Sequence, residues 1–143
     1  MTTPSPDAMD ADPRLPFLRH VGIRVLPEDD GPTVCEIDLR DDLRNRAGML
    51  QGGVTATLLD VVGGVAAARV AGTPAIATAD LNIHYLAPIR VGPARAEATV
   101  LRKGRSTVIV EARVIDAGAN ERLCAMSTMT LTVLGPETRA VAT

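Results

Sequence analysis

The feature that most constrains this chain is a long run of small and aliphatic residues with almost no charge. The run from Gly52 to Ala71 follows a polar, glycine-containing turn and stops before Gly72 and Pro74, which predicts one long helix. Its charged residues are Asp60, in the middle, and Arg69, near the C-terminal end, where a cation suits the helix dipole. A carboxylate in the middle of such a helix is costly unless it is paired, hydrogen-bonded or used in chemistry.

The predicted helix has two unlike faces. A bulky apolar stripe suited to a core comprises Val54, Leu58, Val61, Val62 and Val65. A second face, with one charge among small residues, comprises Gly53, Ala56, Thr57, Asp60, Gly64 and Ala67. Small residues permit close approach by another backbone or by a ligand. The alternative is that Asp60 is structural and pairs with a distant Lys or Arg, since ion pairs also bury carboxylates.

Composition narrows the classes of protein. With 143 residues and a net charge of −2, the chain fits one domain and has no electrostatic reason to bind nucleic acid or an anionic membrane. The sparse pair Cys35 and Cys124, with no export signal at the N-terminus, predicts reduced thiols in the cytoplasm. We do not expect the apolar run to cross a membrane, because Asp60, the glycines and the strand-forming sequence after it argue against that.

Turn residues divide the rest of the chain. We expect a disordered tail over residues 1–13, a single domain over 14–135 and a loose tail over 136–143. A short helix is predicted over residues 14–20, anchored by Leu15, Phe17 and Leu18. Alternating apolar and polar residues predict strands over 22–26, 33–39, 75–86, 94–102, 106–116 and 123–134.

The order of these elements predicts an α+β fold. Two strands, one long helix and four strands with short connections favour an antiparallel sheet with the helix on one face. The other sheet face and the small-residue face of the helix then remain to be covered. Both point to an oligomer.

A set of polar and glycine residues around the predicted helix and the next strand resembles a known family. The set is Asn45, Gly48, Gly52, Gly53 and Asp60, the segment Asp80-Leu-Asn-Ile-His-Tyr-Leu-Ala-Pro88, the segment His20-Val-Gly-Ile-Arg-Val25 and the turn Lys103-Gly104-Arg105. Over about residues 17–134 it resembles the hotdog-fold acyl-CoA thioesterases of the phenylacetate-pathway (PaaI) type. The resemblance implies an antiparallel β-sheet wrapped around one long central α-helix, in homodimers that often form a dimer of dimers.

The same resemblance implies roles for individual residues. The family's catalytic carboxylate corresponds to Asp60, and the backbone amide that polarises the thioester carbonyl corresponds to Gly52. The loop Asn corresponds to Asn45, and a hydroxyl residue that helps to hold the water corresponds to Thr78. The activity implied is hydrolysis of an acyl-CoA to a free acid and coenzyme A, with no cofactor apart from coenzyme A in the substrate.

One position departs from the family pattern. The family usually has His immediately before the Gly pair, where this chain has Gln51. Glutamine can donate and accept hydrogen bonds but cannot titrate. Gln51 can therefore position groups as the family His would, but it cannot act as an acid or base in its place.

The chemistry of thioester hydrolysis restricts how these residues can be arranged. Helix N-termini supply free N–H groups for an oxyanion, and glycine lets the substrate come close, which suits Gly52 and Gly53. Asp60 is competent either as a general base on water or as a nucleophile. Gly52 and Asp60 lie roughly 12 Å apart along one helix, whereas donor and base must both lie about 3 Å from one reacting centre. We therefore predict a site shared by two subunits, with Asn45 and Gly52 from one and Asp60 and Thr78 from the other.

Thr78 has a weaker claim on the sequence alone. Simple alternation places Ala77, Ala79, Leu81, Ile83 and Tyr85 on the apolar face of their strand and Thr78 on the polar face. A bulge, or a place at the dimer seam, would have to bring Thr78 into the site. The alternative is a strand threonine with no role.

Four cations near turns could hold the phosphates of coenzyme A, although solvated hairpin tips explain them nearly as well. They are Arg90, Arg102, Lys103 and Arg105. His20 and His84 have no second ligand at metal spacing, so no metal is predicted. Two other functions stay open: a hydratase or dehydratase of acyl thioesters, and a non-catalytic acyl-CoA binder.

Overall fold

The computed structural model describes residues 15–27 and 30–136, and the expected tails lie outside these ranges except for Pro136. The elements are α2 (Pro16–Val21), β1 (Arg24–Val25), β2 (Thr33–Ile37), η1 (Asp41–Leu43), α3 (Gly52–Ala71), β3 (Ile76–Tyr85), β4 (Ala94–Lys103), β5 (Thr107–Asp116) and β6 (Arg122–Val133). The long helix has its predicted bounds, because Gly72 ends it in the left-handed conformation that glycine readily adopts.

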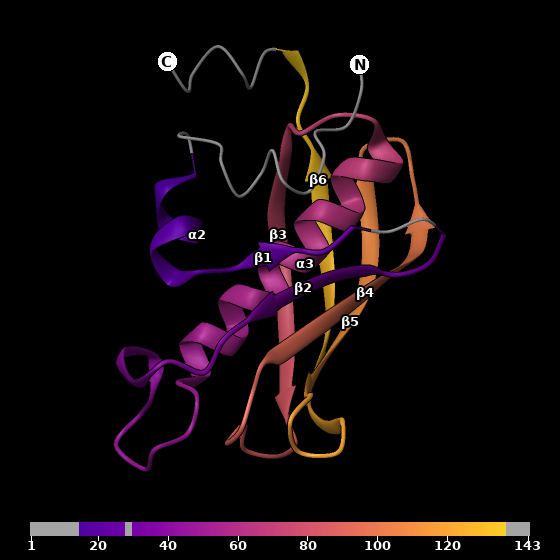
Figure 1. The fold of residues 1–143 in the computed structure, drawn as a ribbon. Helices are drawn as coiled ribbons and strands as arrows, with labels where there is room; N and C mark the ends of the chain where they lie inside the picture. Colours follow the sequence, from indigo (N-terminus) through magenta and orange to yellow (C-terminus); the bar gives the residue numbers. More distant parts are fainter. Residues whose placement is uncertain (1–14, 28–29, 137–143) are drawn as a thin grey trace.

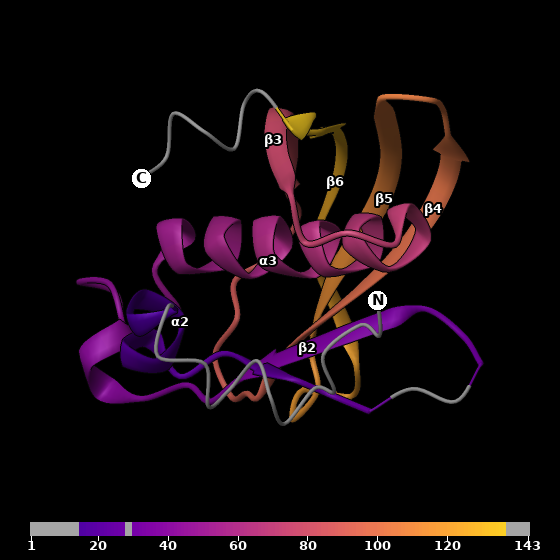
Figure 2. The ribbon, with the colours of Figure 1, turned by 90° about the horizontal axis from the view of Figure 1, so that it is seen from above.

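The six strands form one antiparallel sheet in the order β1-β2-β4-β5-β6-β3. Figure 1 shows α3 in front of β3 and β6, with β1 and β2 crossing in front of the helix. Figure 2 shows the sheet curving around the helix, with β3, β6, β5 and β4 on one side and β2 on the other. This arrangement confirms the predicted α+β fold, an antiparallel sheet wrapped around one long helix.

The core between α3 and the sheet is aliphatic. Every second residue of β5 from Val108 to Val114 is buried, as expected for a strand with one face inward. Leu58 and Val62 of α3 are fully buried against this face. The helix approaches β6 closely at Gly63, where an added Cβ would overlap the sulfur of Met129. Glycine at this position therefore sets how near the helix lies to the sheet.

For two residues the predicted exposure is wrong. Ala67, assigned to the small-residue face, is fully buried in the core because the sheet covers that side of the helix near its C-terminal end. Phe17, assigned as an anchor of the short helix, is 59% exposed, and Leu18 packs against the core instead. The other five small-face residues are exposed or partly exposed.

Among the described residues, α3 is long and apolar enough to cross a membrane by length and composition. Here it is the central core helix of the sheet, with Leu58, Leu59 and Val62 fully buried. Its apolar composition is therefore explained by the core.

The sheet face away from α3 carries charged side chains that pair with one another. Glu36 on β2 accepts a hydrogen bond from Arg95 on β4 at 2.7 Å, and Glu111 pairs with Arg113 on β5. An antiparallel sheet can expose such a face to water. The expectation that an oligomer covers this face stays a prediction, and the open side of the helix and the β3 edge are further features that favour an oligomer.

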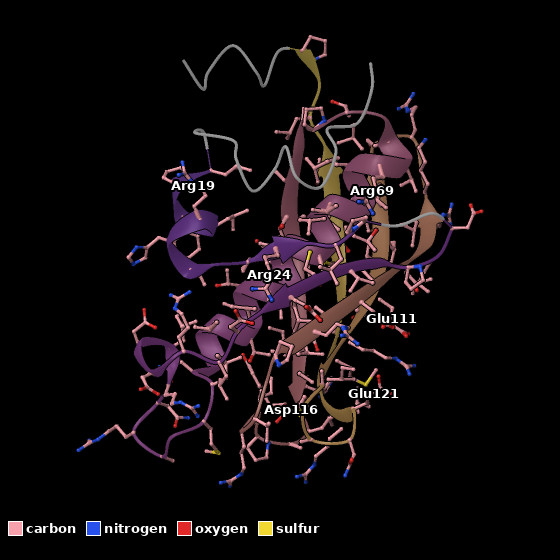
Figure 3. All side chains as sticks on the ribbon, viewed as in Figure 1. Arg19, Arg24, Arg69, Glu111, Asp116 and Glu121 are labelled. Carbon is pink, nitrogen blue, oxygen red and sulfur yellow. The ribbon has the colours of Figure 1, made fainter. Side chains whose placement is uncertain are left out.

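Asp116, at the end of β5, fixes the loop between β3 and β4. Its side chain is buried and accepts hydrogen bonds of 2.7–3.1 Å from the N–H groups of residues 90–92. In the same loop, the carbonyl of Ile89 accepts from the N–H of Leu50 at 3.0 Å, just before α3 begins. Figure 3 labels Asp116 at this end of the sheet. The buried carboxylate thereby ties the β3–β4 loop to the segment that leads into the helix.

Hydrogen bonding keeps this carboxylate charged. Burial raises the pKa of Asp116, but the backbone N–H groups of Arg90, Gly92, Val91 and Gly118 outweigh burial and hold that pKa below its usual value. Because the folded pKa is lower than the unfolded one, the charged form stabilises the fold above the unfolded pKa of about 3.9. That contribution is lost as the pH falls through the folded pKa.

Asp116→Asn should lower the free energy of unfolding at pH 7 by about 1–3 kcal/mol, because the amide loses the charge and turns an NH₂ group toward N–H donors. Urea unfolding at a series of pH values measures the effect, and the gap from wild type should narrow below about pH 4. Asp42→Asn, which removes only an exposed partner of Arg40, is the control and should change stability little. A gap that stays constant with pH would contradict the role of the charge.

Candidate active site

A hydrogen bond joins the mid-helix carboxylate to the strand that follows the helix. The hydroxyl of Thr78 on β3 donates to Oδ1 of Asp60 on α3 at 2.6 Å. The structure thus brings together two residues that the sequence predicted for the site. No Lys or Arg in residues 15–27 and 30–136 forms an ion pair with Asp60. Within these described residues, nothing supports the alternative that Asp60 is half of an ion pair.

Thr78 reaches the helix because β3 contains a β-bulge. Thr78 pairs with Leu131 of β6 and Asp80 pairs with the preceding β6 residue, so Ala79 is an extra residue between them. Paired residues of an antiparallel sheet share a face, and Leu131 is fully buried in the core. The bulge therefore turns Thr78 toward α3.

The bulge also corrects the predicted faces of this strand. Leu81 and Ile83, beyond the bulge, pair with buried residues of β6 and face the helix as predicted. Ala77 and Ala79 are exposed, so their assignment to the apolar face is wrong. Strand alternation has a period of two residues, and one inserted residue reverses the facing of everything on one side of it.

The N-terminus of α3 presents free backbone donors. The carbonyl of Gln51 accepts from the N–H groups of Val54 at 2.9 Å and Thr55 at 3.2 Å. Within the described residues, the N–H groups of Gly52 and Gly53 donate to no acceptor, as is usual in the first turn of a helix. The Gln51 side chain is exposed and does not cap the helix. These donors can therefore meet a ligand.

Asn45 organises the loop before the helix. Its Oδ1 accepts hydrogen bonds from the N–H groups of Ala47 at 2.9 Å and Met49 at 3.2 Å. The turn contains Gly48 in the left-handed conformation, with φ of 76°. The side-chain oxygen of Asn45 is thus committed to the loop, and its NH₂ group is the part that could donate to a ligand.

The sequence did not single out Tyr85, which contacts the helix N-terminus. Its hydroxyl donates to the carbonyl of Gly52 at 2.7 Å, across 33 residues of chain. The signal available in the sequence was that the one tyrosine of the chain stands at the end of a predicted strand. No local pattern links that position to Gly52.

The free donors and the carboxylate lie at different places along α3. The helix is continuous from Gly52 to Ala71, so Gly52 and Asp60 are roughly 12 Å apart at about 1.5 Å per residue. The side of the helix around them is open, since a Cβ added at Gly53 or Gly64 would meet nothing within 4 Å. One chain does not bring donor and carboxylate to one reacting centre. Sharing between two subunits stays a prediction.

The four cations expected to hold phosphates do not form one cluster within one chain. The N–H of Arg90 bonds to Asp116, at the end of the sheet where β4 begins. Arg102 and Lys103 end β4, and Arg105 follows in the hairpin. At about 3.3 Å per residue, the strand from position 94 to position 102 spans about 26 Å. Arg90 is therefore far from the other three in the same chain.

Known proteins are similar to this chain in sequence and in fold. The thioesterase superfamily model matches residues 47–122, a segment that contains the helix N-terminus, Asp60 and Thr78. A Saccharolobus solfataricus protein named as a proposed esterase is 33% identical over 101 residues, 71% of this chain and 72% of that protein. Human acyl-coenzyme A thioesterase 13 is 33% identical over 93 residues, 63% of this chain and 66% of that protein.

Two solved structures show how far the fold agrees. A thioesterase from Haemophilus influenzae superposes with a TM-score of 0.83 at 21% identity, over 94% of this chain and 93% of that chain. A conserved protein from Pseudomonas aeruginosa superposes with a TM-score of 0.74 at 28% identity, over 82% of this chain and 93% of that chain. Together with the family match, the helix held in a curved antiparallel sheet identifies this chain as a hotdog-fold thioester hydrolase of the thioesterase superfamily.

Proposed function

We propose that this chain hydrolyses an acyl-CoA thioester to a carboxylic acid and coenzyme A. The observation that carries the proposal is the Asp60 carboxylate, which Thr78 holds on the open side of α3. Acyl-CoA as substrate is supported by the human relative, which is an acyl-coenzyme A thioesterase. A carboxylate that has no cation partner among the described residues, beside small residues, suits a reacting group better than a structural one.

The contact with Thr78 leaves one carboxylate oxygen for the reaction. As a general base, Asp60 takes a proton from water while the water oxygen bonds to the thioester carbon. The carbonyl oxygen becomes an oxyanion, which the N–H of Gly52 stabilises. When the tetrahedral intermediate collapses, the C–S bond breaks and the proton on Asp60 passes to the departing thiolate.

A nucleophilic route uses the same residues. Asp60 bonds to the carbonyl carbon, the thiolate of coenzyme A leaves, and water then cleaves the mixed anhydride to release the acid. In both routes the hydroxyl of Thr78 orients the Asp60 carboxylate. The N–H of Gly52 must then face that carboxylate across the thioester. Asn45 and Gln51, which precede these donors in the chain, are proposed to position the thioester through their side-chain amides.

Two copies of the chain are proposed to complete the site by pairing their β3 strands. β3 is ten residues long and pairs on one side with β6, so its other edge is a template for pairing. A two-fold axis near the middle of β3 places the Thr78 end of one copy beside the Tyr85 end of the other. Since Thr78 contacts Asp60 and Tyr85 contacts Gly52, this brings Gly52 of one copy toward Asp60 of the other.

The same two-fold exchange concerns the phosphates of coenzyme A. Arg90 lies at one end of the sheet and the β4–β5 hairpin at the opposite end. The two-fold axis reverses the second copy, so Arg90 of one copy and the hairpin of the other lie at the same end of the joined sheet. Arg102, Lys103 and Arg105 belong to that hairpin region, so both copies are proposed to contribute cations. Assembly of two such dimers and a cytoplasmic location remain predictions from the sequence.

Release of free thiol tests the proposed function. Wild-type protein incubated with short, medium, long-chain and aryl acyl-CoAs should release coenzyme A and free acid in equal amounts, for at least one member of the panel, over many turnovers. Chemical detection of the thiol and chromatography of the acid measure both products. Saturable binding of these thioesters without release would instead establish a non-catalytic acyl-CoA binder.

Mixing two inactive variants tests the shared site. Asp60→Asn removes the carboxylate, and Gly52→Pro removes the N–H at the first helical position, which tolerates proline. Gln51 already has the extended conformation, with ψ of 132°, that suits a residue before proline. If subunits exchange freely, half of the dimers are mixed and each has one intact site, so activity should reach about one quarter of wild type.

Gly52→Ala is the matched control, because alanine keeps the N–H and its Cβ would lie an ordinary 3.6 Å from the Tyr85 ring. Gly52→Ala should therefore remain active where Gly52→Pro is not. If both groups acted within one chain, a mixed dimer would contain no intact site. Mixed dimers, verified by mass spectrometry, that show no activity would contradict a shared site.

A further inference from the structure

Tyr85 stands where it can act on the donors at the start of α3. Its hydroxyl donates to the Gly52 carbonyl at 2.7 Å, and its ring lies 3.6–3.7 Å from the place of a Cβ on Gly52. The contact fixes the end of β3 to the first residue of the helix. The Thr78–Asp60 bond fixes α3 to the same strand further along.

Packing alone does not explain the hydroxyl. The Tyr85 side chain is 55% exposed, so it contributes little to the core. A phenylalanine would make the same ring contact with Gly52. The feature that a tyrosine adds is the hydrogen bond to the first carbonyl of the helix.

That carbonyl belongs to the peptide group whose N–H is carried by Gly53. A hydrogen bond accepted by a carbonyl polarises its peptide group and strengthens the N–H at the other end as a donor. It also fixes the orientation of the peptide plane. The N–H of Gly53 has no acceptor within the described residues, and a Cβ on Gly53 would meet nothing within 4 Å. The donor is therefore accessible.

We propose that Tyr85 is a positioning residue for thioester hydrolysis, which orients and polarises the Gly52–Gly53 peptide so that Gly53 supplies a second N–H to the oxyanion. The inference rests on the proposed function and adds a donor and a residue to it. In the absence of the hydroxyl, the donor remains but its peptide is less well oriented. Tyr85 thus acts through Gly53 and not on the substrate.

Tyr85→Phe is the direct test, because it removes one oxygen and keeps the ring. Loss of one neutral hydrogen bond that matters in the transition state should lower kcat about 2- to 10-fold, with KM nearly unchanged. The melting temperature of the same sample separates this from a structural role, in which stability falls and kcat of the folded protein does not. Full kcat in Tyr85→Phe beside an active wild type overturns this inference alone.

The single tyrosine of the chain gives a second readout. The chain has one Tyr and no Trp, so its intrinsic emission reports on Tyr85. Titration with a thioether analogue of an acyl-CoA should change this emission, with the same Kd as calorimetry. N-acetyltyrosinamide titrated in the same way corrects for absorption by adenine.

The binding and hydrolysis results distinguish failure of the Tyr85 inference from failure of the proposed function. Calorimetric binding without a change in emission places the ligand away from Tyr85 and overturns this inference while the proposed function stands. A wild-type protein that neither binds nor hydrolyses any acyl-CoA overturns the proposed function, and this inference with it.

Discussion

One hydrogen bond, from Thr78 to Asp60, depends on a single extra residue in β3. Without Ala79 as a bulge, alternation would point Thr78 away from the helix, and Asp60 would face the open side of α3 with no partner from the strand. The bulge interrupts the pairing with β6 and in return orients a carboxylate. Bulges are frequent beside active sites, where they redirect a side chain.

The straight helix imposes the second constraint. α3 supplies both the free N–H groups and the carboxylate, and its rise holds them roughly 12 Å apart. The strand that contacts both is also an edge strand of the described sheet. One edge can therefore hold the two halves of the site in register and pair with a second copy. This links the proposed dimer to the chemistry.

Much of the fold follows from local patterns. Glycine and proline bound the helix and the hairpins, and alternation identifies the strands, so α3 and β4 to β6 were predicted with ends within one or two residues. Asp60 could be singled out because a lone carboxylate in an aliphatic helix needs a reason.

The rest depends on contacts between distant residues. The bulge at Ala79 is defined by register with β6, and no pattern within β3 reveals it. Tyr85 contacts Gly52 only because the sheet curves around the helix. Arg90 and Arg102 lie far apart because the extended strand β4 runs between them. Ala67 is as small as its neighbours on the open side, yet the sheet covers it. Such features require the tertiary structure.

The central claim is that Asp60 performs the reaction, and one comparison tests it most directly: turnover and melting temperature of Asp60→Asn in the same sample. Asparagine is nearly isosteric and can still accept from Thr78, so the fold and the binding of acyl-CoA should persist. Removal of the base or nucleophile should lower kcat at least about a hundredfold. A variant that melts several degrees lower but hydrolyses acyl-CoA at the wild-type rate would show that Asp60 is structural.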